Sequence, residues 1–97
     1  MAKGYWIALY RSISDPARLS QYAALAGPAI AAGGGRFVAR GTAAATFEGG
    51  ENQRTVIIEF DDVSRAVGTY NSPAYQAAVA VLRGAVEREV RIVEGVG

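Results

Sequence analysis

The order of the apolar patterns along this chain of 97 residues predicts an α+β fold. Four segments show the two-residue alternation of strands, and two longer stretches show the 3.6-residue spacing of helices. Their order is strand, helix, strand, strand, helix, strand. A chain of this length has room for one domain, so we predict a single domain over residues 1–97. Hydrophobic residues make up 51% of the chain. This is a high share for a small domain, and it indicates that apolar surface is buried between subunits.

The first strand is expected at residues 5–11, with apolar side chains on both faces, as in a strand that is covered on two sides. A helix follows, because Ser14 or Asp15 can cap its start and Pro16 suits its first position. Its expected buried stripe has helical spacing and consists of Leu19, Tyr22, Ala23, Ala26 and Ile30. Gly27-Pro28 predicts a kink or a second short helical segment. Residues 33–35, all glycine, predict the end of the helix.

The second strand is expected at residues 36–40. Strict alternation places Phe37 and Ala39 on one face and Arg36, Val38 and Arg40 on the other. Residues 41–50 are expected to continue this strand as a bent or bulged edge, because Gly41 and the small residues after it weaken regular pairing. Residues 49–52 predict a turn.

The third strand, at residues 54–60, has the clearest alternation. Val56, Ile58 and Phe60 share one face, and Thr55, Ile57 and Glu59 share the other. Asp61 or Asp62 can cap a short helix that runs to Tyr70, and Ser72-Pro73 restarts it. The stripe of this second part is expected to consist of Tyr75, Ala78, Val79, Leu82 and Val86. The last strand is expected at residues 88–96, with Val90 and Ile92 on one face.

This order of elements predicts a ferredoxin-like βαββαβ fold, in which both helical regions cover one face of a four-stranded antiparallel sheet. The other face of that sheet is left bare. The first, third and last strands carry apolar residues on both faces. Two copies of the chain would bury these bare faces against each other, so we predict a homodimer with the architecture of a dimeric α+β barrel.

Five short stretches resemble the domain of unknown function 1330 family, within the dimeric α+β barrel superfamily. They are "KGYWIA" at residues 3–8, "GGRFVARG" at 34–41, "VIIEF" at 56–60, "YNSPAYQ" at 70–76 and "IVEG" at 92–95. They follow the family order and span nearly the whole chain. The resemblance implies the fold and a dimer, but no reaction. Members of the superfamily include cofactor-free oxygenases, haem-degrading enzymes and isomerases that act on small hydrophobic compounds.

The composition excludes several classes of site. Ten basic and nine acidic residues give a net charge of +1. No basic run is present, so we expect no nucleic-acid partner. The chain has no cysteine and no histidine. Disulfides, thiolate chemistry and the usual zinc ligands are therefore excluded, and we expect no metal and no cofactor. No stretch approaches the length of a membrane span and no signal peptide is evident, so a cytoplasmic protein is expected.

Arg83 and Glu59 are the first two candidates for a ligand site. On an ideal helix Arg83 lies at the flank of the buried stripe, where its guanidinium needs an acceptor or an anionic ligand. Glu59 shares a strand face with Ile57, and a carboxylate on an apolar face is either paired or functional. It is read either as paired with Arg36, Arg40 or Arg83, or as a general base whose pKa is raised by desolvation.

The other ligand-binding candidates are Tyr22, Tyr70, Tyr75 and Arg40. The tyrosines, together with Trp6, form either an aromatic pocket or plain core. Arg36 and Arg40 share one strand face in this reading, about 13 Å apart, and they are read as solvated or as residues of a dimer interface. Ser72 is read as a helix cap.

Two functions remain open at this point. In the first, a cavity between helices and sheet binds a small apolar or aromatic metabolite, with cofactor-free proton transfer or oxygenase chemistry as its catalytic form. In the second, the chain is a structural or binding homodimer without chemistry. The sequence alone assigns no catalytic residue. A haem-degrading role ranks third, because no histidine is present to hold the iron.

Overall fold

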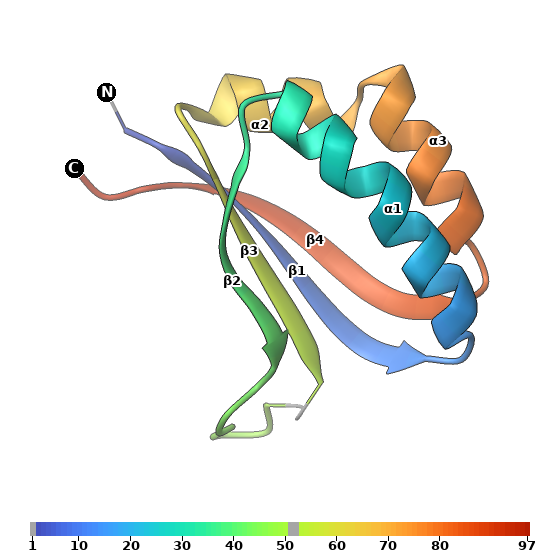
Figure 1. The fold of residues 1–97 in the computed structure, drawn as a ribbon. Helices are drawn as coiled ribbons and strands as arrows, with labels where there is room; N and C mark the ends of the chain where they lie inside the picture. The colour runs from blue at the N-terminus through green and yellow to red at the C-terminus, as the bar shows by residue number, and fades with distance from the viewer. Residues whose placement is uncertain (1, 51–52) are drawn as a thin grey trace.

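The computed structural model describes residues 2–50 and 53–97. It shows a curved antiparallel sheet with all its helices on one face (Figure 1). The elements are β1 (Gly4–Ile13), α1 (Pro16–Ala32), β2 (Arg36–Thr42), β3 (Arg54–Phe60), α2 (Val63–Tyr70), α3 (Pro73–Leu82) and β4 (Val86–Glu94). The four strands lie in the order β2-β3-β1-β4. This is the ferredoxin-like βαββαβ arrangement, with the second helical region divided into α2 and α3, and it confirms the predicted fold class.

The two faces of the sheet differ in burial as the alternation predicts. Trp6, Ala8 and Tyr10 of β1 are buried beneath the helices, as are Val56, Ile58 and Phe60 of β3. None of the helices in residues 2–50 and 53–97 covers the opposite face (Figure 1), which we call the open sheet face. It carries Tyr5, Ile7 and Leu9 of β1, Thr55, Ile57 and Glu59 of β3, and Glu89, Arg91 and Val93 of β4. The first and third strands are therefore confirmed in both position and facing.

Side-chain caps start all three helices at the predicted residues. The Asp15 carboxylate accepts a hydrogen bond from the amide of Arg18, and that of Asp62 accepts one from the amide of Arg65. The Ser72 hydroxyl accepts one from the amide of Tyr75, which confirms Ser72 as a cap. Each cap satisfies an amide that has no partner within its own helix.

The helix α1 is one unbroken helix, so the expected second segment at Gly27-Pro28 is wrong. Pro28 lies inside this helix, and the nearby residues Ala26, Ala29 and Ile30 are buried. A proline removes one intrahelical hydrogen bond, and packing of the flanking residues on the sheet compensates for that loss. The helix ends at Gly33, and the following Gly34 has a φ of 88°, a conformation that favours glycine.

A β-bulge in β2 changes the predicted facing of this strand. Phe37 pairs with Ile58 and Ala39 pairs with the adjacent Ile57, so Val38 is an extra residue opposite β3. Alternation is shifted by one residue after Val38. The prediction that Arg36 and Arg40 share a face is therefore wrong: Arg36 pairs with Glu59 on the open sheet face.

The loop between β2 and β3 contains a turn that is closed by a hydrogen bond from the amide of Gly50 to the carbonyl of Phe47, 2.9 Å long. The turn was predicted at residues 49–52, and positions 51–52 of it lie outside the described residues. No helix in residues 2–50 and 53–97 combines the length and apolar character needed to cross a membrane.

Candidate functional site

A cavity of about 60 Å³ lies between α1 and the helix-covered face of the sheet. Its floor comes from β1, β2 and β3 and includes Trp6, Ala8, Val56 and Ile58, and its roof is the inner side of α1. A water molecule needs roughly 10–15 Å³ of such space and takes up about 30 Å³ of liquid volume. The cavity therefore has room for about four to six water molecules.

Small residues leave this space open. Ala8 lies in the floor, and Ala23, Ala26 and Gly27 face it from α1. A methyl group placed on Gly27 would meet no atom within 4 Å, so the helix does not close onto the sheet there. Larger side chains at these positions would fill the layer as ordinary core. The cavity is thus a consequence of residue size on two facing elements.

Arg88 of β4 brings three tyrosines together at one end of this cavity. Its guanidinium donates to the hydroxyls of Tyr10, Tyr22 and Tyr75 at 3.2, 3.3 and 3.0 Å. The hydroxyls of Tyr22 and Tyr75 also form a hydrogen bond of 2.6 Å. The guanidinium lies over the ring of Tyr22, 5.0 Å from its centroid, so cation–π attraction adds to the hydrogen bonds.

The protonation states of this cluster follow from its burial. Burial raises the pKa of Tyr75 and of Tyr10 above the ordinary value, so both phenols stay neutral at physiological pH. Burial opposes the charge of Arg88, but the surrounding phenol oxygens more than offset this and raise the pKa of Arg88. The cluster therefore holds one fixed positive charge on Arg88, and neither Tyr10 nor Tyr75 is a ready base.

Two further arginines line the cavity. Arg40 of β2 reaches it because the bulge turns this residue to the helix-covered face, where its guanidinium lies 4.8 Å from the centroid of the Phe37 ring. Arg54 lies at the start of β3, and its Nε atom is buried without a hydrogen-bond partner in the described part of the chain. Among residues 2–50 and 53–97, no aspartate or glutamate lines the cavity.

Four of the six predicted ligand-binding residues lie at or next to this site. Tyr22 and Arg40 line the cavity. Tyr75 is fully buried beside it and contacts both Tyr22 and Arg88. Tyr70 packs against Tyr75, with ring centroids 5.2 Å apart, and borders a separate, shallow hollow next to Arg88. Whether any of them binds a ligand stays a prediction.

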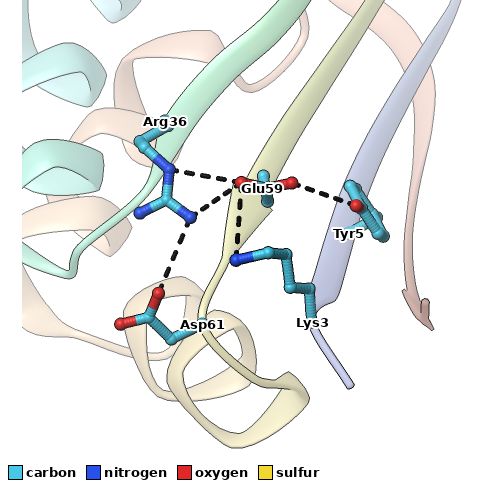
Figure 2. A network of polar contacts seen from close by, with 5 residues as sticks. All are labelled: Lys3, Tyr5, Arg36, Glu59 and Asp61. Carbon is cyan, nitrogen blue, oxygen red and sulfur yellow. Dashed lines mark hydrogen bonds and ion pairs between the residues drawn. The ribbon is translucent and has the colours of Figure 1, made fainter. Parts of the chain in front are cut away.

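Glu59 lies on the other side of the sheet from the cavity, in a polar network on the open sheet face (Figure 2). Its carboxylate accepts a hydrogen bond of 2.7 Å from Arg36 and one of 3.0 Å from the hydroxyl of Tyr5. Lys3 approaches it to 3.9 Å, and Arg36 also lies 3.6 Å from Asp61. The predicted pairing of Glu59 with Arg36 is confirmed, and the alternative pairings with Arg40 and Arg83 are wrong.

These contacts lower the pKa of Glu59, mainly through the hydrogen bond from Arg36 and then through that from Tyr5. A carboxylate held in its charged form is a weak base. The interpretation of Glu59 as a general base with a raised pKa is therefore wrong. Desolvation alone would have raised the pKa, but the donors around the carboxylate outweigh it.

Arg83 is exposed at the end of α3, so its predicted place on the flank of a buried stripe is wrong. The helix stops at Leu82, and Arg83 has an extended conformation as its C-terminal cap. Gly84 follows with a φ of 77° and turns the chain into β4. Val86, expected in the helical stripe, begins that strand instead. The carbonyl of Arg83 accepts a hydrogen bond from the side chain of Arg18.

Replacing Glu59 with glutamine is expected to remove a pH-dependent part of the stability. The folded-state pKa of Glu59 is lowered, so its contribution is complete above the unfolded-state pKa of about 4.3 and is lost as the pH falls through the folded-state value. In urea unfolding between pH 7 and pH 3, the variant should be less stable than the parent at pH 7 and should approach it at low pH. Glu94→Gln, at an exposed position, is the control. If the difference in unfolding free energy between Glu59→Gln and the parent does not change with pH, the lowered pKa of Glu59 in this network is wrong.

Of the tyrosines and arginines that line the cavity, three were not among the sequence candidates: Tyr10, Arg54 and Arg88. A signal for the two arginines was present in the sequence. Arg54 has the same two-residue parity as Val56, and Arg88 has the same parity as Val90 and Ile92, which pack against the core. Strand alternation therefore predicts that both arginines lie on the helix-covered face.

Solved structures with the same fold come from several organisms. A protein of unknown function from Rhodopseudomonas palustris is similar, with 18% identity and a TM-score of 0.74 over 99% of this chain and 84% of that one. A dimeric ferredoxin-like protein of unknown function from Thermobifida fusca has 18% identity and a TM-score of 0.67 over 96% and 91%. SnoaB, a cofactor-independent oxygenase from Streptomyces nogalater, has 14% identity and a TM-score of 0.61 over 99% and 93%. At these identities the likeness shows the fold alone.

No curated protein matches the chain in sequence. A family model, in contrast, matches residues 3–96, which is nearly the whole chain. The match includes every strand and helix described above, together with the arginines and tyrosines of the cavity. The chain belongs to the family described as Domain of unknown function (DUF1330).

Proposed function

We propose that this protein binds a small apolar or aromatic metabolite in the cavity between α1 and the sheet. The observation that carries this proposal is the cavity itself, which combines an aromatic and aliphatic lining with a few polar groups at its edge. Such a lining is typical of small-molecule sites. At about 60 Å³ this cavity is smaller than the engineered apolar cavity of about 150 Å³ that accepts benzene, so binding of one small ring requires lining side chains to move apart.

The geometry supports binding ahead of general acid–base catalysis. The described lining contains no carboxylate, the chain has no histidine, and the pKa values of Tyr10 and Tyr75 are raised. A proton transfer or cofactor-free oxidation in this cavity would depend on a substrate that loses its own proton easily. The guanidinium groups would then stabilise the anion that forms.

A space-filling substitution at the cavity mouth tests this proposal. Ala23 and the adjacent Ala24 are both exposed on α1, but only Ala23 lines the cavity. We expect Ala23→Leu to weaken binding of a monocyclic compound about tenfold or more, because added methylene groups compete for the same space. Ala24→Leu is the matched control and should bind like the parent protein. The measurement is ligand-observed NMR with a panel of monocyclic compounds.

Two results would contradict a binding function at this cavity. If Ala23→Leu and Ala24→Leu bind a compound equally well, that compound binds elsewhere. If no monocyclic compound binds the parent protein, the alternative function, a structural homodimer without a ligand, is favoured.

We also propose that the protein works as a homodimer whose subunits meet through the open sheet face. Ile7 and Ile57 are directly paired in the middle of this face, and Val93 of β4 is 48% exposed. Charged residues of the face are paired with one another, as in the contact of 3.2 Å between Arg91 and Glu89. A second copy would therefore cover apolar surface without leaving these charges unpaired. Proteins of this fold from Thermobifida fusca and Bacteroides fragilis are described as dimeric.

A further inference from the structure

We propose that the cavity selects a small organic anion, a compact apolar or aromatic carboxylate, which its arginines bind through the carboxylate oxygens. This inference rests on the proposed binding function and specifies the class of ligand. It starts from the charge of the lining, because three arginines line this one cavity and none of its described lining residues is a carboxylate.

The ion pairs of the described residues all lie away from the cavity. They join Glu59, Asp61 and Glu89 to Lys3, Arg11, Arg36 and Arg91. Arg40, Arg54 and Arg88, the three arginines that line the cavity, take part in none of them. Three arginines therefore line one small space whose described lining carries no negative charge. Such a space attracts an anion.

The strand pairing brings two of these arginines within reach of one anion. Arg40 pairs directly with Val56, and Arg54 lies two residues before Val56 on the same strand and the same face. The two arginines are thus diagonal neighbours, about 7–8 Å apart at the backbone, and long side chains can converge over this distance. The planar guanidinium group suits a carboxylate, because it can donate two parallel hydrogen bonds.

Arg54 also has a buried hydrogen-bond donor for which the described residues provide no acceptor. Its Nε atom is buried and has no hydrogen-bond partner among residues 2–50 and 53–97. A buried donor without a partner is costly, and such donors in native structures call for a specific explanation. A ligand carboxylate in the cavity supplies the acceptor. Arg88, in contrast, is held by three tyrosine hydroxyls and contributes mainly its charge.

The remaining lining residues indicate what the uncharged part of this ligand is like. Trp6, Phe37 and Ile58 border the cavity on the sheet side, and Ala26 and Ile30 border it on α1. These side chains offer no hydrogen bond to the far end of a ligand, apart from the indole N–H group of Trp6. A ligand with one anionic end and one compact apolar end matches this polarity, whereas an inorganic anion would leave the apolar part unfilled.

Benzoate and benzamide test this inference, since they have nearly the same shape and differ in charge. Trp6, which lines the cavity, is the only tryptophan, so its fluorescence reports binding there. We expect the parent protein to bind benzoate about tenfold or more tighter than benzamide, as hydrogen bonds between charged groups predict. Arg54→Met should weaken benzoate binding more than benzamide binding and so reduce this preference, because hydrogen bonds to a charged acceptor are the stronger ones. Arg65→Met, at an exposed position on α2, is the matched control and should keep the preference.

The possible outcomes separate this inference from the proposed function. If benzoate and benzamide bind equally well and Ala23→Leu weakens both, the cavity binds small molecules but anion selection is wrong. If inorganic phosphate displaces benzoate at equal concentration, the site is one for inorganic anions and the organic acid is wrong. If neither compound binds the parent protein, anion selection is wrong, and the proposed binding function is wrong as well only if no other monocyclic compound binds. Should Arg54→Met fail to fold, Arg40→Met replaces it, with the same expected reduction of the preference for benzoate.

Discussion

Replacing Tyr75 with alanine is expected to lower the free energy of unfolding by about 3–5 kcal/mol, as for other large aromatic residues in protein cores. The Tyr75 side chain is fully buried at the centre of an aromatic cluster. Its ring centroid lies 4.7 Å from that of Trp6 and 6.0 Å from that of Tyr22. Domains of this size have a total stability of roughly 5–15 kcal/mol, so this one substitution removes a large share of it.

Two further variants separate packing from hydrogen bonding in this cluster. Tyr75→Phe keeps the ring but removes the hydroxyl bonded to Tyr22 and Arg88, and it should cost about 1 kcal/mol. Phe47→Ala is the control for loss of an aromatic ring, because Phe47 is 80% exposed, and it should change stability by less than about 0.5 kcal/mol.

Urea unfolding followed by circular dichroism measures all three variants, at one protomer concentration because a dimer makes stability concentration-dependent. If Tyr75→Ala were as stable as Tyr75→Phe, the ring would not be a core residue, and the packing of α3 on the sheet would have to be reconsidered.

Replacing Ile7 with lysine is expected to dissociate the proposed homodimer. Ile7 lies in the middle of the open sheet face, between Ile57 of β3 and Arg91 of β4. A lysine here would place an unpaired charge in the proposed interface, beside an existing arginine. An uncompensated buried charge costs about 3–5 kcal/mol, so the dissociation constant should rise by at least about 100-fold.

Sedimentation velocity over a dilution series measures this change. Ala24→Lys adds the same charge to the exposed side of α1 and is the control that should remain dimeric. If the parent protein is a monomer at all concentrations, the proposed dimer is wrong. If Ile7→Lys is as dimeric as the parent, the subunits meet through another surface.

Much of the fold could be predicted from the sequence because it depends on local patterns. The alternation in residues 54–60 placed Val56, Ile58 and Phe60 on the buried face, and the structure agrees. The capping residues Asp15, Asp62 and Ser72 act on amides three residues away, so their effect can be read from a short stretch of chain. The resemblance to the family was also confirmed.

The candidate site could be predicted only in part, because its residues meet through contacts between distant elements. Tyr22 and Arg40 were identified and line the cavity. Arg54 and Arg88 were overlooked although their parity pointed inward. The facing of Arg40 could not be predicted correctly, since it depends on a bulge at Val38 that becomes visible only in the register with β3. Arg83 was misplaced, because the helix stops at Leu82 where Gly84 turns the chain into the last strand.

The sequence by itself determined the order of strands and helices, the starts of the helices and the two faces of β1 and β3, since period, caps and glycines act over a few residues. Only the tertiary structure decided that Glu59 pairs with Arg36 and Tyr5, and that Arg40, Arg54 and Arg88 surround one cavity. The physical reason is that strand register and the distance between α1 and the sheet arise from packing across the whole chain. These two features decide which charged side chains form ion pairs and which ones line the cavity.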